Sequence, residues 1–196
     1  MDEIKSAAEI AMEKAERLGE ATGEERLGWK YVPEGRKLAV EYVKQGSNLV
    51  LELGKYEENV KKYIIQGASE VLIGNIGLPG SDIARKSNKK AMDGLKMVKS
   101  DKAGVENVFS KIRRIFDHYA GQGEQQKRQA YQSLKADFEA KMKQALQQQF
   151  GSYMGAKIDV ERQPQFQEEW RKAQAQLNSQ YLALLGEYKQ ELSAIS

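Results

Sequence analysis

The sequence contains no cysteine, only three prolines and a single histidine in its 196 residues. The absence of cysteine excludes disulfide bonds, thiolate metal sites, iron–sulfur clusters and a cysteine nucleophile. With His118 as the lone histidine, zinc sites built from histidines and most histidine proton relays are nearly excluded as well. We therefore expect neither a metal nor another cofactor, and no enzymatic activity.

Long hydrophobic runs are also missing. Runs such as Leu49–Leu51 and Val71–Ile73 are far shorter than the about 20 residues that a membrane-spanning helix needs. The first residues, Met1 to Lys5, are acidic and lack the basic and apolar regions of a signal peptide. These features indicate a soluble, cytoplasmic protein with no membrane span.

Apolar residues recur three and four positions apart along most of the chain, which is the spacing of one helix face. The pattern predicts an all-α fold, with helices that include 34–43 after Pro33, and 82–99. Gly67 is expected to interrupt a helix, and Gly121-Gln122-Gly123 to end one. Residues 74–82 combine a Pro-Gly turn with a Ser-Asp pair that can cap the following helix, so they predict a hinge.

The last third of the chain differs from the rest. Residues 124–150 and the stretch from Pro164 onward consist almost entirely of strong helix formers, each with one narrow apolar stripe. We expect an N-terminal bundle of short helices over 1–120, followed by a long antiparallel helical hairpin over 121–196.

Helices this long need a partner for their stripes, so the leading hypothesis is a non-enzymatic interaction or scaffold protein. It would use the hairpin to self-associate or to bind a protein partner. The side chains expected to bind this partner are Tyr131, Leu134, Phe138, Met142, Phe166, Trp170, Leu177, Tyr181, Leu184 and Tyr188.

Positive charge is concentrated in one segment. Residues 82–114 carry 10 basic and 4 acidic side chains, whereas 1–81 carry 11 and 14. A local excess of this kind is typical of a surface that meets phosphates, so the alternative hypothesis is an RNA- or ribosome-associated protein. The competing interpretation is a solvated face, or a face neutralised by the acidic first helix. The basic residues concerned are Arg85, Lys86, Lys89, Lys90, Lys96, Lys99, Lys111, Arg113 and Arg114.

Four carboxylates, Glu9, Glu13, Glu16 and Glu20, share one face of the first predicted helix by their spacing. Such a face could hold a hard cation, but helical di-metal sites usually add histidines, and none is nearby. Basic neighbours four residues away favour an ordinary, salt-bridged solvent face.

Three stretches carry a family resemblance: Ala-Ala-Glu-Ile-Ala-Met-Glu-Lys-Ala-Glu-Arg-Leu-Gly at 7–19, Asn-Ile-Gly-Leu-Pro at 75–79 and Gln-Pro-Gln-Phe-Gln-Glu-Glu-Trp at 163–170. They resemble an uncharacterised family of small, all-helical hypothetical bacterial proteins. The resemblance covers most of the chain and implies a stand-alone protein. No activity is attached to this family, so it implies nothing about mechanism.

Overall fold

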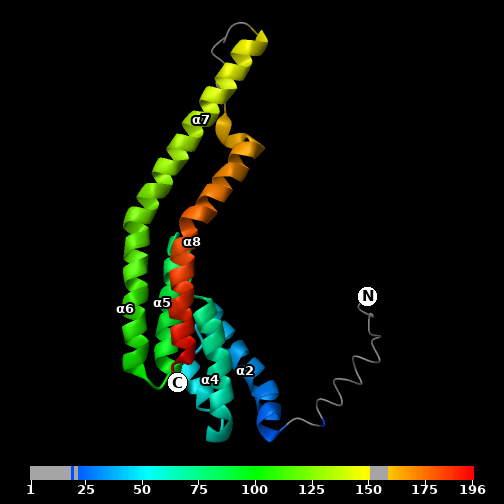
Figure 1. Ribbon diagram of the computed structural model, residues 1–196. Coiled ribbons are helices and arrows are strands. Elements are labelled where there is room, and N and C mark those ends of the chain that lie inside the picture. The colour runs from blue at the N-terminus through cyan, green and yellow to red at the C-terminus, as the bar shows by residue number, and fades with distance from the viewer. Residues whose placement is uncertain (1–18, 20–21, 151–158) are drawn as a thin grey trace. The chain divides into compact units, whose positions relative to one another are not determined.

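The computed structural model describes Gly19, residues 22–150 and residues 159–196. In this part of the chain every regular element is a helix, so the predicted all-α class is confirmed there. The α-helices are α2 (Gly23–Gln45), α3 (Leu49–Leu53), α4 (Glu58–Gly74), α5 (Asp82–Val98), α6 (Lys102–His118), α7 (Glu124–Phe150) and α8 (Pro164–Ala194). A π-helical turn, η1 (Tyr119–Gly123), and a 3₁₀ turn, η2 (Val160–Arg162), complete the list (Figure 1).

The described residues form two compact units that alternate along the chain. The first unit contains the residues up to Ile76, together with Lys86–Val105 and Ser193–Ser196. The second unit contains Gly77–Arg85 and Glu106–Leu192. The predicted domain boundary after residue 120 stays a prediction.

The helix predicted over 34–43 in fact begins eleven residues earlier, at Gly23. Thr22 forms a capping box, in which its hydroxyl accepts from the Glu25 N–H at 3.2 Å and its own N–H donates to the Glu25 carboxylate at 2.8 Å. Pro33 therefore lies inside α2, on an exposed face, and not at its start. The prediction was wrong because a strong cap and tertiary packing outweigh the one backbone hydrogen bond that a proline removes.

Gly67 does not interrupt a helix, as predicted, but lies buried within α4 where this helix crosses α2. A Cβ on Gly67 would lie 2.9 Å from the carbonyl carbon of Val32. The reciprocal position, Gly35 on α2, would place a Cβ 2.8 Å from the carbonyl carbon of Ile64. The two glycines therefore allow the backbones of α2 and α4 to approach more closely than any side chain would permit.

The core of the first unit is built around this crossing. Leu38 and Tyr42 of α2 are buried with Leu72 of α4 and Leu95 of α5. The Tyr42 hydroxyl donates to the Lys90 carbonyl oxygen of α5 at 3.2 Å, so even the polar end of this buried ring has a partner.

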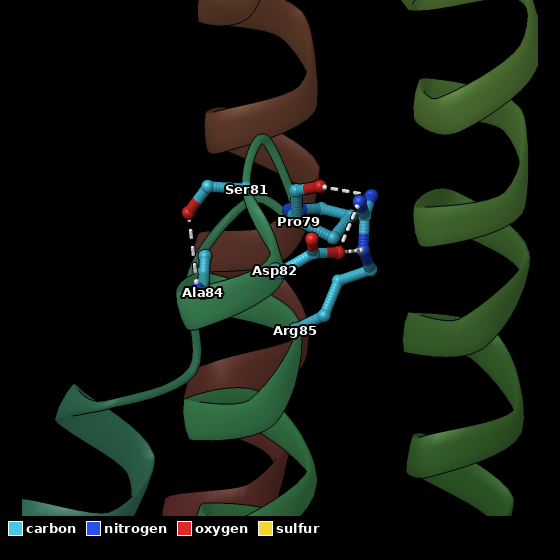
Figure 2. Close-up of polar contacts among 5 residues, drawn as sticks. All are labelled: Pro79, Ser81, Asp82, Ala84 and Arg85. Carbon is cyan, nitrogen blue, oxygen red and sulfur yellow. Dashed lines mark hydrogen bonds and ion pairs between the residues drawn. The ribbon is translucent and has the colours of Figure 1, made fainter.

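The predicted hinge lies between α4 and α5. Ser81 caps α5, because its hydroxyl accepts from the Ala84 N–H at 3.1 Å (Figure 2). The Arg85 guanidinium donates to the Asp82 carboxylate at 2.8 Å and to the Pro79 carbonyl oxygen at 3.1 Å. The loop and the first turn of α5 are thus joined by one side chain.

In the second unit α6 continues into α7 through the π-helical turn η1, as Figure 1 shows. The prediction that Gly121-Gln122-Gly123 ends a helix was therefore wrong. Gly123 is buried beside the aromatic rings of Tyr119 and Tyr181, and its Cβ position would lie 3.3 and 3.4 Å from their atoms. The glycines make room for the wider turn and for the ring packing against it.

Replacement of Gly67 by alanine tests the helix crossing. Because the added methyl group would meet backbone that cannot rotate away, we expect Gly67→Ala to lower the free energy of unfolding by about 3 kcal/mol. Gly74→Ala is the matched control, since it lies on the same helix with no atom within 4 Å of the new Cβ. Chemical denaturation followed by circular dichroism measures both. Equal stability of the two variants would contradict the close approach of α2 and α4.

Candidate partner-binding cleft

The second unit contains a cleft of about 960 Å³ between α8 and the face formed by α6 and the start of α7. Its lining mixes basic, amide, aromatic and aliphatic side chains and contains no carboxylate. The lining residues are Lys111, Arg114, Ile115, His118, Gln126 and Ala130 on one side, and Ala173, Gln176, Leu177, Gln180, Tyr181, Leu184 and Tyr188 on the other.

The α6 wall presents a row of basic groups. Lys111, Arg114 and His118 are three and four residues apart, so they project from one helix face. Lys111 pairs with Glu191 at 2.7 Å, and this hydrogen bond raises the pKa of Lys111. The Arg114 guanidinium has no ion-pair partner in the described part of the chain and is exposed.

The α8 wall presents apolar and aromatic groups. Tyr181 and Tyr188 are half-buried, and each contacts the opposite wall. The Tyr181 hydroxyl lies 2.8 Å from His118 Nδ1, and the Lys111 ammonium lies 5.4 Å from the centre of the Tyr188 ring. Leu184 remains 39% exposed between them, so an apolar side chain is available at the centre of the wall.

A polar network at the π-helical turn adjoins the cleft. The buried Tyr119 hydroxyl donates to Asn178 Oδ1 at 3.2 Å and accepts from the Lys127 ammonium. Burial lowers the pKa of Lys127, but its hydrogen bonds to Tyr119 and Glu124 outweigh this effect and the net pKa is raised. The network joins η1, α7 and α8 at one point, and every polar atom named in it has a partner.

The predicted partner-binding residues separate into two groups. Leu177, Tyr181, Leu184 and Tyr188 line the cleft. The other six, which lie outside it, are Tyr131, Leu134, Phe138, Met142, Phe166 and Trp170.

The aromatic members of the second group contact one another between α7 and α8. The rings of Tyr131 and Trp170 are 5.0 Å apart and those of Phe138 and Phe166 are 5.5 Å apart, both edge to face. Phe166 is only 2% exposed. These rings cover part of the stripe within the chain, and their binding of a partner stays a prediction.

The basic residues predicted as one phosphate-binding surface do not share one environment. Lys111 and Arg114 line the cleft, and Arg113 pairs with Glu106. Arg85 is engaged by Asp82 and Pro79 (Figure 2).

On α5, Lys90 lies 5.4 Å from the centre of the Tyr42 ring, whereas Lys86, Lys89 and Lys96 are exposed. Lys99, predicted to belong to the phosphate-binding surface, is buried, with 6% of its surface exposed. The burial of Lys99 has a simple cause. The residue directly follows the end of α5, and its ammonium group donates a hydrogen bond to the carbonyl oxygen of Ile195.

Sequence reasoning missed the glutamines of the cleft, Gln126, Gln176 and Gln180, and did not include His118 among the partner-binding residues. A signal was present in the spacing, because 176, 180 and 184 recur every four residues beside the apolar stripe. The facing of α6 and α8, however, could be seen only in the structure. The carboxylate face formed by Glu9, Glu13, Glu16 and Glu20 lies outside the described residues.

Two kinds of feature are absent from the described residues. No group of three or more histidine, aspartate or glutamate side chains in them could hold a metal ion. None of their helices combines the length and the apolar character that crossing a membrane requires.

The connection before α8 provides a pH-dependent test of the structure around the rings. Glu161 has a lowered pKa, first because Lys135 donates a hydrogen bond to it and then because Tyr131 does. A carboxylate with a folded-state pKa below its ordinary value of 4.5 stabilises the fold above that pH, and the contribution is lost as the pH falls through the lowered pKa. Glu161→Gln should therefore melt at a lower temperature than the wild type near neutral pH. The difference between the two melting temperatures should become smaller in acid.

Thermal melts at several pH values measure the gap. Glu187→Gln, an exposed change on α8 with no ion pair in the described part of the chain, serves as the control and should show no such narrowing. A gap that stays constant down to strongly acidic pH would contradict the role of Glu161.

Comparison with known proteins gives one match. Residues 51–194 match the model of a family of unknown function, DUF6657. No curated protein and no solved structure matches the chain.

Proposed function

Since the chain belongs to the DUF6657 family, which is of unknown function, we propose a function from the geometry of the cleft: a non-enzymatic helical protein that binds a partner protein. In this proposal α7 and α8 act as a long helical hairpin, and the partner lies in the cleft between α6 and α8. The observation that supports it is the pairing of an apolar wall on α8 with a basic row on α6.

The dimensions of the cleft suit a helical segment. Its α8 wall extends from Ala173 to Tyr188, which at about 1.5 Å per residue is about 22 Å, or four helical turns. Both walls are helix faces, so a third helix could lie along the open side of the cleft and insert side chains three and four residues apart between the Tyr181 and Tyr188 contacts. This is the helix-in-groove mode of recognition.

The basic side chains of the cleft favour a partner with acidic side chains. Lys111, Arg114 and His118 line it without any carboxylate among the lining residues. A partner helix with acidic side chains beside an apolar stripe would match both walls, and its carboxylates would direct association with the exposed Arg114. We therefore expect an acidic, amphipathic helix. A second copy of this chain, or its own acidic N-terminal segment, is the alternative occupant that the experiment must distinguish.

The experiment uses a photo-reactive residue in the full-length protein within its own cells. p-Benzoyl-phenylalanine at position 184, in the cleft, should cross-link to the partner, whereas the same residue at position 182 should not. Leu182 is the matched control because it is on the same helix, 52% exposed, and does not line the cleft. Peptide mapping of the cross-link identifies the occupant as another protein, a second copy or residues 1–20 of the same chain.

Cross-linking to a helical, acidic segment of another protein supports the proposal. Cross-linking to a second copy or to the N-terminal segment would overturn the heterologous partner, as would equal cross-linking from positions 182 and 184.

Charge reversal on α6 provides the quantitative prediction. Arg114→Glu should weaken the binding of the mapped partner peptide at least about tenfold, because the new carboxylate would face acidic side chains. Arg128→Glu makes the same change at an exposed site outside the cleft, so it should leave affinity within about twofold. Fluorescence anisotropy with the labelled peptide measures both affinities. Similar losses in the two variants would refute specific recognition by the cleft.

A second function, binding of RNA or the ribosome, is supported by a different observation. Lys86 and Lys89 on α5 are exposed and have no ion-pair partner in the described part of the chain, and Lys96 is exposed beside them. Lysines on the exposed face of one helix are suited to contacts with phosphates, which would make binding sensitive to salt.

The double change Lys89→Glu and Lys96→Glu should abolish binding to a fluorescein-labelled polyuridine RNA and leave helicity intact. Lys141→Glu with Lys143→Glu, on α7, changes the net charge equally at exposed positions and should preserve most of the binding. A filter-binding titration at low and high salt measures the effect. Equal retention of RNA by both double variants would exclude the α5 surface.

A further inference from the structure

A second cavity, of about 640 Å³, lies within the first unit and is independent of the cleft. It is bordered by one face of α4, the end of α5 and the last residues of the chain. Its lining residues are Lys62, Ile65, Gln66, Ser69, Glu70, Ile73, Val98, Lys99, Ser100, Ser193 and Ser196.

Ser69 lines this cavity with an unsatisfied hydroxyl. The residue is only 4% exposed, and its Oγ has no hydrogen-bond partner. A buried hydroxyl without a partner costs about 1–3 kcal/mol relative to one that is hydrogen-bonded, and an alanine would fill the same space without this cost. The serine is thus a poor choice for stability alone.

Lys99 lines the same cavity with a buried ammonium group. It is 6% exposed, and its Nζ donates to the Ile195 carbonyl oxygen. No carboxylate of the described residues forms an ion pair with it, and burial lowers its pKa. Buried lysines normally have a charged partner, because the interior does not solvate the ammonium group as water does.

The other charged side chains on the lining already have partners of their own. The Glu70 carboxylate accepts from Arg36 at 2.8 Å, and Lys62 pairs with Glu24 at 2.8 Å. Among the charged side chains on the lining, Lys99 is therefore the one that forms no ion pair with a side chain of the described residues. The remaining lining residues are the aliphatic Ile65, Ile73 and Val98 and the polar Gln66, Ser100, Ser193 and Ser196.

We propose that this cavity is a binding site for a small organic anion. The carboxylate or phosphate of the ligand would accept hydrogen bonds from the Lys99 ammonium and the Ser69 hydroxyl, which satisfies both groups at once. An apolar portion of the ligand would pack against Ile65, Ile73 and Val98. The cavity volume falls within the range of about 300–1,000 Å³ that is typical of small-molecule sites.

The site makes a combined prediction about stability and binding. Without ligand, Ser69→Ala should melt at a higher temperature than the wild type, because it removes an unsatisfied buried group. The same variant should lose at least about tenfold in affinity for an anion, because it also removes a hydrogen-bond donor to a charged acceptor. Replacement of a residue with a purely structural role would not raise the melting temperature and at the same time lower the affinity for the anion.

The probes are phenyl phosphate and benzoate, which share a charged head and an aromatic body, with neutral benzyl alcohol as the comparison. Amide chemical shifts of the full-length protein should change around Ser69 and Lys99 with either anion and not with the alcohol. Ser47→Ala is the matched control: it removes another unpartnered buried hydroxyl, but Ser47 does not line the cavity, so affinity should be unchanged. Lys99→Met, checked for a native circular dichroism spectrum, should abolish binding.

Shifts at Ser69 that are weakened by Ser69→Ala and preserved in Ser47→Ala support the site. The absence of shifts at millimolar anion, or shifts that persist unchanged in Ser69→Ala, would overturn it. Shifts confined to Lys111 and Arg114 would also overturn it, since they would place the anion in the cleft of the second unit.

Discussion

The covering of narrow apolar stripes on long helices is the constraint on which the second unit depends. A stripe one side chain wide cannot be buried by its own helix, so α6, α7 and α8 must cover one another. At the π-helical turn η1, the rings of Tyr119 and Tyr181 cover each other. They pack edge to face, with their centres 5.1 Å apart. Polar groups hold the contact in place, because the Tyr119 hydroxyl bonds to Asn178 and Lys127.

The same contact leaves the cleft beside it incompletely filled. Tyr181 reaches across to His118 and Tyr188 lies beside Lys111, but Leu184, between them on α8, stays partly exposed. Tyrosine and lysine side chains are longer than leucine, so they can reach across a cleft that leucine does not fill. Two long side chains therefore bridge the cleft, and the space between these bridges is not filled by the described residues.

In the first unit the helices pack by close backbone contact and not through long side chains. Gly35 and Gly67 bring α2 and α4 into backbone contact, and the core around them is tightly closed. Against this close packing, the unpartnered Ser69 hydroxyl and the buried Lys99 ammonium are exceptions to the rule that buried polar groups are satisfied. Unsatisfied buried groups of this kind are expected mainly at functional sites. Ser69 and Lys99 therefore indicate a binding site more strongly than the residues around them do.

Much of this architecture was determined by the sequence alone. The three- and four-residue spacing and the scarcity of proline dictated an all-α fold, and Ser81 marked the start of α5 correctly, because caps and helix faces are local properties. Only the tertiary structure decided the rest. The sequence predicted Pro33 and Gly67 as helix breakers, yet both lie within helices. Packing and capping stabilise these helices by more than the proline and the glycine destabilise them. Likewise, the sequence predicted Lys99 on a basic surface, but the fold buries it. The spacing of residues also could not show that α8 faces the basic row of α6. Which faces meet depends on contacts between residues far apart in the chain, and no local pattern encodes them.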